Sequence, residues 1–232
     1  MNNGFATSQI EKIFITASGG PFLNLNKKKL NMVNPSKAVQ HPNWKMGKKI
    51  SVDSATLMNK VFEVIEAQRI FNLKKKFFEI LIHPKSYLNS IIKYKNGTTK
   101  LLIHDTTMKI PIFNYVYSDL KHKLNTNKIN FNVLNNLELK KPINKQFPLL
   151  KMLNKIPENI SLFETVLISA NDELVENFLN GNIKFNQIHK ILFKIVNLKE
   201  FKKFKYKKPK NLEQIIKLNK YVRLKTLNQC IV

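Results

Sequence analysis

The sequence predicts an α+β fold in which a region of mixed helices and strands precedes a bundle of helices. Three observations support this prediction. A helical spacing of apolar residues begins at Ser54, short apolar runs typical of strands follow one another over residues 77–104, and helical patterns return at Leu149. Strands that succeed one another directly, instead of alternating with helices, are typical of an α+β fold rather than a doubly wound sheet.

The first expected element is an apolar strand over residues 10–16, which ends at the turn sequence ASGGPF of residues 17–22. The polar, lysine-rich residues 23–40 predict a short helix and a loop. We expect the next helix to begin with Ser54 as its N-cap. Its buried side would carry Leu57, Val61, Val64, Ile65 and Gln68.

Two strands are expected after this helix, over residues 77–82 and 90–95. The dipeptide Asn96-Gly97 is typical of a hairpin turn, so a third strand is expected over residues 98–104. In the helical region that follows, Gly181 is the expected C-cap of the first long helix.

The chain is expected to contain two domains joined by a linker. Residues 1–117 would form the α+β domain and residues 147–232 the helical domain. Residues 118–146 would form the linker, because they are rich in Asn and Lys and have weak periodicity. A chain of 232 residues with 43% hydrophobic residues is long enough to bury a core.

The charge of the chain has two explanations. A net charge of +25 would suit a nucleic acid or an anionic membrane, because a positive surface attracts phosphate groups. However, only Arg69 and Arg223 are arginine, the side chain that binds phosphate and guanine through two parallel hydrogen bonds. A bias toward Lys, Asn and Ile along the whole chain is the simpler explanation, and we expect no nucleic-acid partner.

The sequence also predicts the cellular compartment of the protein. Cys230 is the only cysteine, so the chain cannot form an internal disulfide. No run of about 18 apolar residues predicts a membrane helix, and the N-terminus lacks the pattern of a secretory signal. We therefore expect a cytoplasmic protein with no membrane partner.

The segment HPNWKMGKKISVDSATLMNKVFEVIEA, residues 41–67, combines polar side chains at helical spacing. A helix N-terminus that carries Ser54 and Lys60 is suited to bind a phosphate group, and Asn59 could add a neutral donor. Glu63 lies one turn beyond Asn59. A carboxylate beside a phosphorylated substrate is suited to a divalent cation, and oxygen ligands favour Mg²⁺ or Mn²⁺.

The residues before this helix suggest a lid over about residues 40–49. His41, Met46 and the single tryptophan, Trp44, lie here in a polar run that ends at Gly47. An exposed loop tryptophan is suited to shield a reactive substrate from water. Each residue also has an ordinary explanation: a core tryptophan, a structural histidine, or a solvated polar face of a helix.

Three motifs together resemble the 1-deoxy-D-xylulose 5-phosphate reductoisomerase family: ASGGPF, the segment of residues 41–67, and LIHPKS. The resemblance is strong over residues 13–111 and looser over residues 147–188. It implies the NADPH-dependent conversion of 1-deoxy-D-xylulose 5-phosphate to 2-C-methyl-D-erythritol 4-phosphate in non-mevalonate isoprenoid biosynthesis. It also implies Mg²⁺ or Mn²⁺ as cofactor, a sugar-phosphate substrate and a homodimer.

The resemblance assigns roles to residues of this chain. Those expected to bind the substrate, several through its phosphate, are Ser18, His41, Ser54, Asn59, Lys60 and Glu63. Glu63 would also be a ligand of the divalent metal. Gly47 would lie near NADPH, while Trp44 and Met46 would belong to the lid.

The chain also departs from the family pattern. Family members carry an NADPH-binding domain and an acidic motif with two further metal ligands ahead of ASGGPF, and we expect neither in this chain. Asn89 stands where histidine is usual, and Thr106 and Thr107 stand where a Pro-Asp pair is usual.

Two functional hypotheses remain open at this point. The α+β domain is expected to be a partial catalytic domain, so the chain would be a fragment or one half of a split reductoisomerase. It would then be inactive alone and completed by a separate N-terminal polypeptide that binds NADPH. The alternative is a non-catalytic remnant that acts as a dimerisation or binding module.

Overall fold

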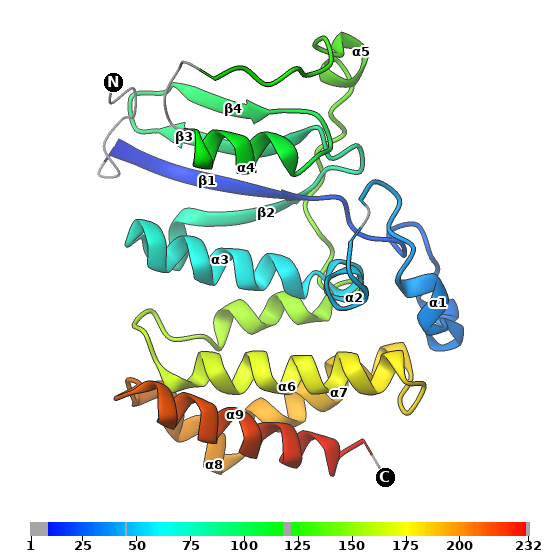
Figure 1. Ribbon diagram of the computed structural model, residues 1–232, viewed down its shortest axis with the longest axis vertical. Coiled ribbons are helices and arrows are strands. Elements are labelled where there is room, and N and C mark those ends of the chain that lie inside the picture. Colours follow the sequence, from blue (N-terminus) through cyan, green and yellow to red (C-terminus); the bar gives the residue numbers. More distant parts are fainter. Residues whose placement is uncertain (1–8, 45, 118–121, 231–232) are drawn as a thin grey trace.

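The computed structural model describes residues 9–44, 46–117 and 122–230. Residue 45 of the predicted lid and residues 118–121 of the predicted linker lie outside the described residues, as do residues 1–8 and 231–232. Figure 1 shows three tiers, with the sheet above, helices α2 and α3 in the middle, and the C-terminal helices below. The predicted α+β fold is confirmed.

The sheet has four strands among the described residues, in the order β2-β1-β3-β4. Their bounds are β1 (Ile10–Ala17), β2 (Phe78–Ile82), β3 (Leu88–Tyr94) and β4 (Thr99–Ile103). Strand β1 pairs parallel with β2 and antiparallel with β3, which pairs antiparallel with β4. The predicted hairpin is confirmed, because Gly97 has a φ of +87° and its N–H donates to the Tyr94 carbonyl at 3.0 Å.

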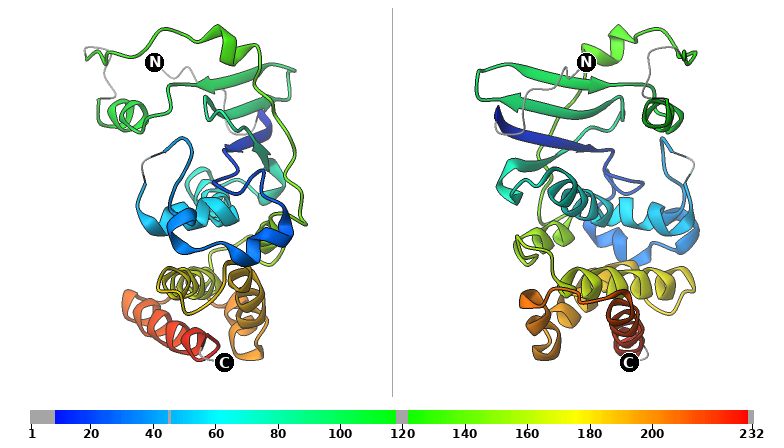
Figure 2. Two further views of the ribbon diagram at one scale, coloured as in Figure 1. Left: turned by 90° about the vertical axis from the view of Figure 1, so that its right-hand side faces the viewer. Right: turned by 60° about the vertical axis from the view of Figure 1, so that its left-hand side comes forward.

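The segment between β1 and β2 crosses from the sheet to the C-terminal helices and back (Figures 1 and 2). Its elements are the 3₁₀ helix η2 (Lys27–Met32), α1 (Pro35–Ala38), α2 (Lys48–Thr56), α3 (Met58–Phe71) and the 3₁₀ helix η3 (Lys75–Phe77). The buried side predicted for the helix after Ser54 is confirmed: Leu57 is buried at the N-cap of α3, and the other four residues are buried within α3. The buried residues of α3 are Met58, Val61, Val64, Ile65 and Gln68.

The prediction that Ser54 is a helix N-cap is wrong. Ser54 lies in the last turn of α2, and the chain turns a corner at Leu57 before α3 begins. Leu57 has a φ of +59°, in the left-handed region that a leucine rarely adopts, and its side chain is fully buried. The hydroxyl of Thr56 accepts the Met58 N–H at 3.3 Å and so takes over part of the capping role.

The C-terminal region is helical, as predicted. Its elements, with those that lead into it, are α4 (Lys109–Val116), α5 (Phe131–Leu134), the 3₁₀ helix η4 (Pro148–Asn154), α6 (Leu162–Leu179), α7 (Phe185–Val196), α8 (Lys199–Lys202), the 3₁₀ helix η5 (Lys203–Tyr206) and α9 (Leu212–Leu227). Both α7 and α9 pack on α6. The prediction that Gly181 is the C-cap of α6 is wrong by one residue: the C-cap is Asn180, and Gly181 follows it with a φ of +81°.

One continuous hydrophobic core runs through the described residues, from Ile10 on β1 to Cys230 after α9. The boundaries of the two domains and the linker therefore stay a prediction. None of the helices in the described part of the chain is long and apolar enough to cross a membrane.

A buried polar cluster ties α2 to the C-terminal helices. The Asp53 side chain is fully buried, and its Oδ1 accepts the Asn171 Nδ2–H from α6 at 2.9 Å. Its Oδ2 lies 2.7 Å from the Lys49 Nζ, which also lies 2.9 Å from Asp172 Oδ1. Burial raises the pKa of Asp53, and the attraction of Lys49 opposes that effect.

Replacing Asn171 tests whether this cluster holds the two regions together. We expect Asn171→Ala to lower the free energy of unfolding by about 2–4 kcal/mol, because a buried carboxylate oxygen loses its donor. Urea unfolding followed by circular dichroism measures the change. The control Asn132→Ala removes an exposed asparagine on α5, with an expected change within about 0.5 kcal/mol. Equal changes in the two variants would contradict a bridging role for Asn171.

Candidate functional site

A glycine turn after β1 brings the distant parts of the site together. Gly20 has a φ of +68°, and a Cβ at this position would lie 2.7 Å from Ala55 Cα and 2.8 Å from the Ser54 carbonyl oxygen. Both neighbours are backbone atoms, so they cannot move aside as a flexible side chain could. Only glycine fits, and the contact puts Ser18 beside the turn that carries Ser54.

The proton positions on His41 follow from its hydrogen bonds. The ring Nδ1 accepts the backbone N–H groups of Asn43 and Trp44, both at 3.1 Å. In the neutral ring Nε2 must then carry the proton, so it donates to the Ser18 Oγ at 2.9 Å. The Gly20 N–H also donates to this Oγ, at 3.2 Å. The Ser18 hydroxyl therefore accepts twice, which leaves its own proton to donate to another group.

The positive charge of Lys60 affects the protonation of His41. Burial lowers the pKa of His41 below its ordinary value of 6.5, and the positive charge of Lys60 lowers it further. At neutral pH His41 is therefore an uncharged donor. The positive charge of this part of the site belongs to Lys60.

The polar face of α3 carries the remaining predicted binding residues. The Lys60 Nζ lies 2.8 Å from both carboxylate oxygens of Glu63, and the Asn59 Nδ2 donates to Glu63 Oε1 at 3.5 Å. Two of the three ammonium N–H groups of Lys60 can thus serve Glu63, and the third can donate to an anion. The pKa of the Glu66 carboxyl is raised above its ordinary value, mainly by burial and also by the negative charge of Glu63.

The base of the predicted lid is held by residues that sequence reasoning did not single out. The Asn43 Nδ2 donates to the Pro84 carbonyl at 2.6 Å and to the Ser86 Oγ at 2.8 Å. Asn43 lies in the segment of residues 41–67 and Ser86 in the motif LIHPKS, and their place in these two family motifs is the signal that could have identified them. Their bonds join the lid segment to the turn between β2 and β3.

The other lid residues lie between this anchor and α2. Trp44 and Met46 are half-buried, and Gly47 is exposed at the N-cap of α2. The Ser51 hydroxyl donates to the Gly47 carbonyl at 3.0 Å and so supports the start of that helix. The structure therefore joins Ser18 to His41, and Asn59 and Lys60 to Glu63, through hydrogen bonds. The two groups are linked by the charge of Lys60, which lowers the pKa of His41, and the Ser54 carbonyl lies against Gly20.

The departures from the family pattern lie next to the lid anchor. The Thr106 hydroxyl is 3.5 Å from the Ser86 carbonyl, and Thr107 accepts the Lys109 N–H at 3.2 Å at the start of α4. Asn89 lies on β3, where its side chain donates to the Tyr87 carbonyl at 3.3 Å. Their polar side chains thus bond to the local backbone.

A complete metal site is not formed by the described residues. No group of three or more His, Cys, Asp or Glu side chains is placed to hold a metal ion within residues 9–44, 46–117 and 122–230. Glu63 offers a single carboxylate, which is already paired with Lys60. These residues do not fit a resident Mg²⁺ or Mn²⁺ without ligands from elsewhere.

The geometry supports anion binding at the corner between α2 and α3. Lys60 belongs to the first turn of α3, whose first N–H groups carry partial positive charge, and Gly20, two residues after Ser18, packs against the last turn of α2. Such a set of donors binds phosphate through geometry and charge together.

Two family models match the chain. Residues 2–71 match the 1-deoxy-D-xylulose 5-phosphate reductoisomerase C-terminal domain, and residues 104–225 match the DXP reductoisomerase C-terminal domain. The reductoisomerase of Pelagibacter ubique is 57% identical over 218 residues, which cover 94% of this chain and 56% of the relative. That of Persephonella marina is 36% identical, over 90% of this chain and 54% of the relative. The chain thus spans just over half the length of these curated relatives.

Solved structures give the same result. DOX-P reductoisomerase in complex with NADPH, fosmidomycin and magnesium has a TM-score of 0.88 and 30% identity, over 97% of this chain and 56% of that one. The reductoisomerase of Zymomonas mobilis in complex with NADPH has a TM-score of 0.82 and 28% identity, over 97% and 56% of the two chains. The chain therefore belongs to the 1-deoxy-D-xylulose 5-phosphate reductoisomerase family.

Proposed function

We propose that this chain provides the phosphate-binding and lid parts of a 1-deoxy-D-xylulose 5-phosphate reductoisomerase. The whole reaction would convert that substrate to 2-C-methyl-D-erythritol 4-phosphate with NADPH, in non-mevalonate isoprenoid biosynthesis. The observation that carries the proposal is the cluster of Ser18, His41 and Lys60 at the corner between α2 and α3.

In this proposal the substrate phosphate occupies the corner. The Ser18 hydroxyl donates its free proton to a phosphate oxygen, and the third N–H of Lys60 donates to another. Asn59 and Ser54 add neutral contacts, since both belong to the turns that form the corner. Neutral His41 holds the Ser18 hydroxyl in place through Nε2–H and adds no charge of its own.

The lid would close over the bound substrate and exclude water. Asn43 fixes the base of the lid on the turn between β2 and β3, while His41 fixes the turn that carries Trp44. Trp44 and Met46 are then the side chains that cover the substrate, and Gly47 lies where NADPH would approach. Water exclusion strengthens the hydrogen bonds to the phosphate.

Glu63 would be one ligand of Mg²⁺ or Mn²⁺. Because the described residues supply no complete metal site, the remaining ligands, like the NADPH-binding domain, would come from outside them. A separate N-terminal polypeptide is one such source. The alternative, a non-catalytic remnant that serves as a dimerisation or binding module, predicts no contribution to turnover.

A homodimer would use the open edge of the sheet. Strand β4 ends the sheet order among the described strands, and its Leu101 and Leu102 are 52% and 57% exposed. An edge strand with exposed apolar side chains is suited to pair with a second copy of the chain.

Analytical ultracentrifugation of the parent chain and of Leu102→Lys tests this dimer interface. The variant should be monomeric where the parent is a dimer, because a charged side chain at the edge opposes strand pairing.

Replacing Lys60 tests phosphate binding directly. We expect Lys60→Gln to weaken binding of 1-deoxy-D-xylulose 5-phosphate by about tenfold to a hundredfold, because a charged hydrogen bond contributes roughly 1.5–3 kcal/mol. Binding of 1-deoxy-D-xylulose, which has no phosphate, should not change. Fluorescence of Trp44, the single tryptophan, and isothermal titration calorimetry provide the measurements.

The control for this test is Lys220→Gln, which removes the same charge from an exposed position on α9. Its affinity for the phosphorylated sugar should match that of the parent. The proposal is contradicted if the two variants lose the same affinity, or if the parent does not discriminate between the sugars.

The protonation of His41 should be visible at Trp44. Above pH 6.5 the ring is neutral in both the folded and the unfolded chain, and Nδ1 accepts the N–H groups that hold the lid turn. As the pH falls through the lowered folded pKa, Nδ1 gains a proton and this stabilisation is lost. Trp44 fluorescence should therefore change with a midpoint below 6.5.

The matched controls are two histidine variants. The fluorescence transition should disappear in His41→Gln and persist in His104→Gln, which alters a histidine after β4. A midpoint at or above the ordinary histidine value, or a transition that survives in His41→Gln, would sink the assignment.

A further inference from the structure

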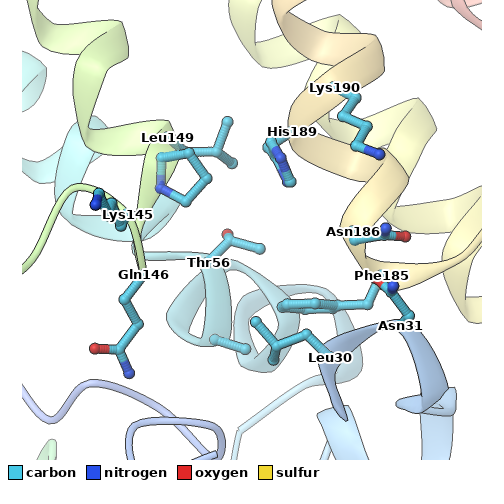
Figure 3. Close-up of a pocket in the computed structure, with 12 residues that line it drawn as sticks. Leu30, Asn31, Thr56, Lys145, Gln146, Leu149, Phe185, Asn186, His189 and Lys190 are labelled. Carbon is cyan, nitrogen blue, oxygen red and sulfur yellow. The ribbon is translucent and has the colours of Figure 1, made fainter. Parts of the chain in front are cut away.

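A cavity of about 400 Å³ lies between the two regions of the chain, beside the last turn of α2 (Figure 3). Its walls come from η2, the last turn of α2, the start of η4 and the N-terminal half of α7. None of the proposed substrate, metal or lid residues lines it. It is therefore separate from the corner that would bind the substrate phosphate.

The cavity combines apolar walls with a basic rim. Leu30, Leu149 and Phe185 provide apolar surface, while Lys190 on α7 and Lys145 in the turn before η4 lie on opposite sides (Figure 3). Among the described residues that line the cavity, none is acidic. An apolar body with a cationic edge attracts a molecule that has an apolar chain and an anionic head.

The size and the position of the cavity also suit a small ligand. Ligand sites usually have volumes of roughly 300–1,000 Å³ and occur preferentially where two domains meet. This cavity is lined by Thr56, from the α+β region, and by Phe185, from the helical region. The aromatic ring of Phe185 is held in place by edge contacts with Phe22 and Phe178, so the wall that it forms is well supported.

We propose that this cavity binds a small amphipathic anion, with its apolar chain against Leu30, Leu149 and Phe185 and its carboxylate or phosphate head near Lys190. The site does not depend on the reductoisomerase reaction. Its occupant would contact Ala55, whose backbone meets Gly20 in the neighbouring turn.

Isothermal titration calorimetry of the chain with octanoate tests the proposal. One octanoate should bind per chain, at least about tenfold more tightly than octanol, which lacks the charge, or acetate, which lacks the chain. Octyl phosphate distinguishes the two head groups. Failure of the parent chain to bind either octanoate or octyl phosphate would overturn the proposal.

Variants separate this site from general attraction to a lysine-rich surface. Lys190→Gln should weaken octanoate binding by about fivefold to tenfold. Lys194→Gln removes an exposed charge one turn further along α7, away from the cavity, and should have no effect. Leu30→Trp, which fills the cavity and keeps every charge, should abolish binding.

Equal losses in Lys190→Gln and Lys194→Gln would overturn the proposal, because binding would then follow the total charge. So would full binding by Leu30→Trp. Circular dichroism of each variant confirms that it is folded, and Leu30→Trp and Lys190→Gln probe the apolar and the charged parts independently.

Discussion

The contact between Gly20 and the backbone of Ser54 and Ala55 is the constraint on which the rest of the site depends. It joins the end of a central strand to the last turn of α2, at distances that no side chain on residue 20 could tolerate. Ser18 then lies within reach of His41, and the corner at Leu57 directs α3 away so that Lys60 and Glu63 face the same region. A backbone contact of this kind fixes geometry more firmly than a side-chain contact, because its neighbours cannot rotate away.

Local patterns in the sequence were enough to predict most of the regular elements. The strands, the hairpin at Gly97 and the buried side of α3 all follow from residue spacing. The corner at Leu57 could not be predicted, because a leucine with positive φ has no signal in the sequence and is held there by burial on every side. The prediction of an N-cap at Ser54 was wrong because the helix boundary lies at this corner instead.

The candidate site was predictable in part. Spacing alone placed Asn59 and Glu63 on one face of a helix, and the structure has them in contact. The bond between Ser18 and His41 spans distant parts of the sequence, so spacing could not predict it, and only the family resemblance grouped the two residues. The lid anchor from Asn43 to Ser86 depends on a turn between two strands, whose path is set by tertiary packing.

The described residues contain only some of the groups that the family's reaction requires. In the proposed function they supply donors for a phosphate and a lid, but only the carboxylate of Glu63 where a metal needs several oxygen ligands. The relatives are nearly twice as long as the matched region, which leaves room in those proteins for the other ligands and for NADPH.

The most direct measurement is NADPH oxidation with 1-deoxy-D-xylulose 5-phosphate and Mg²⁺. It would use this chain alone and then mixed with the part of the Pelagibacter ubique relative that it does not match. The account predicts turnover in the mixture and none with either part alone, whereas no turnover in a mixture shown to associate would contradict it.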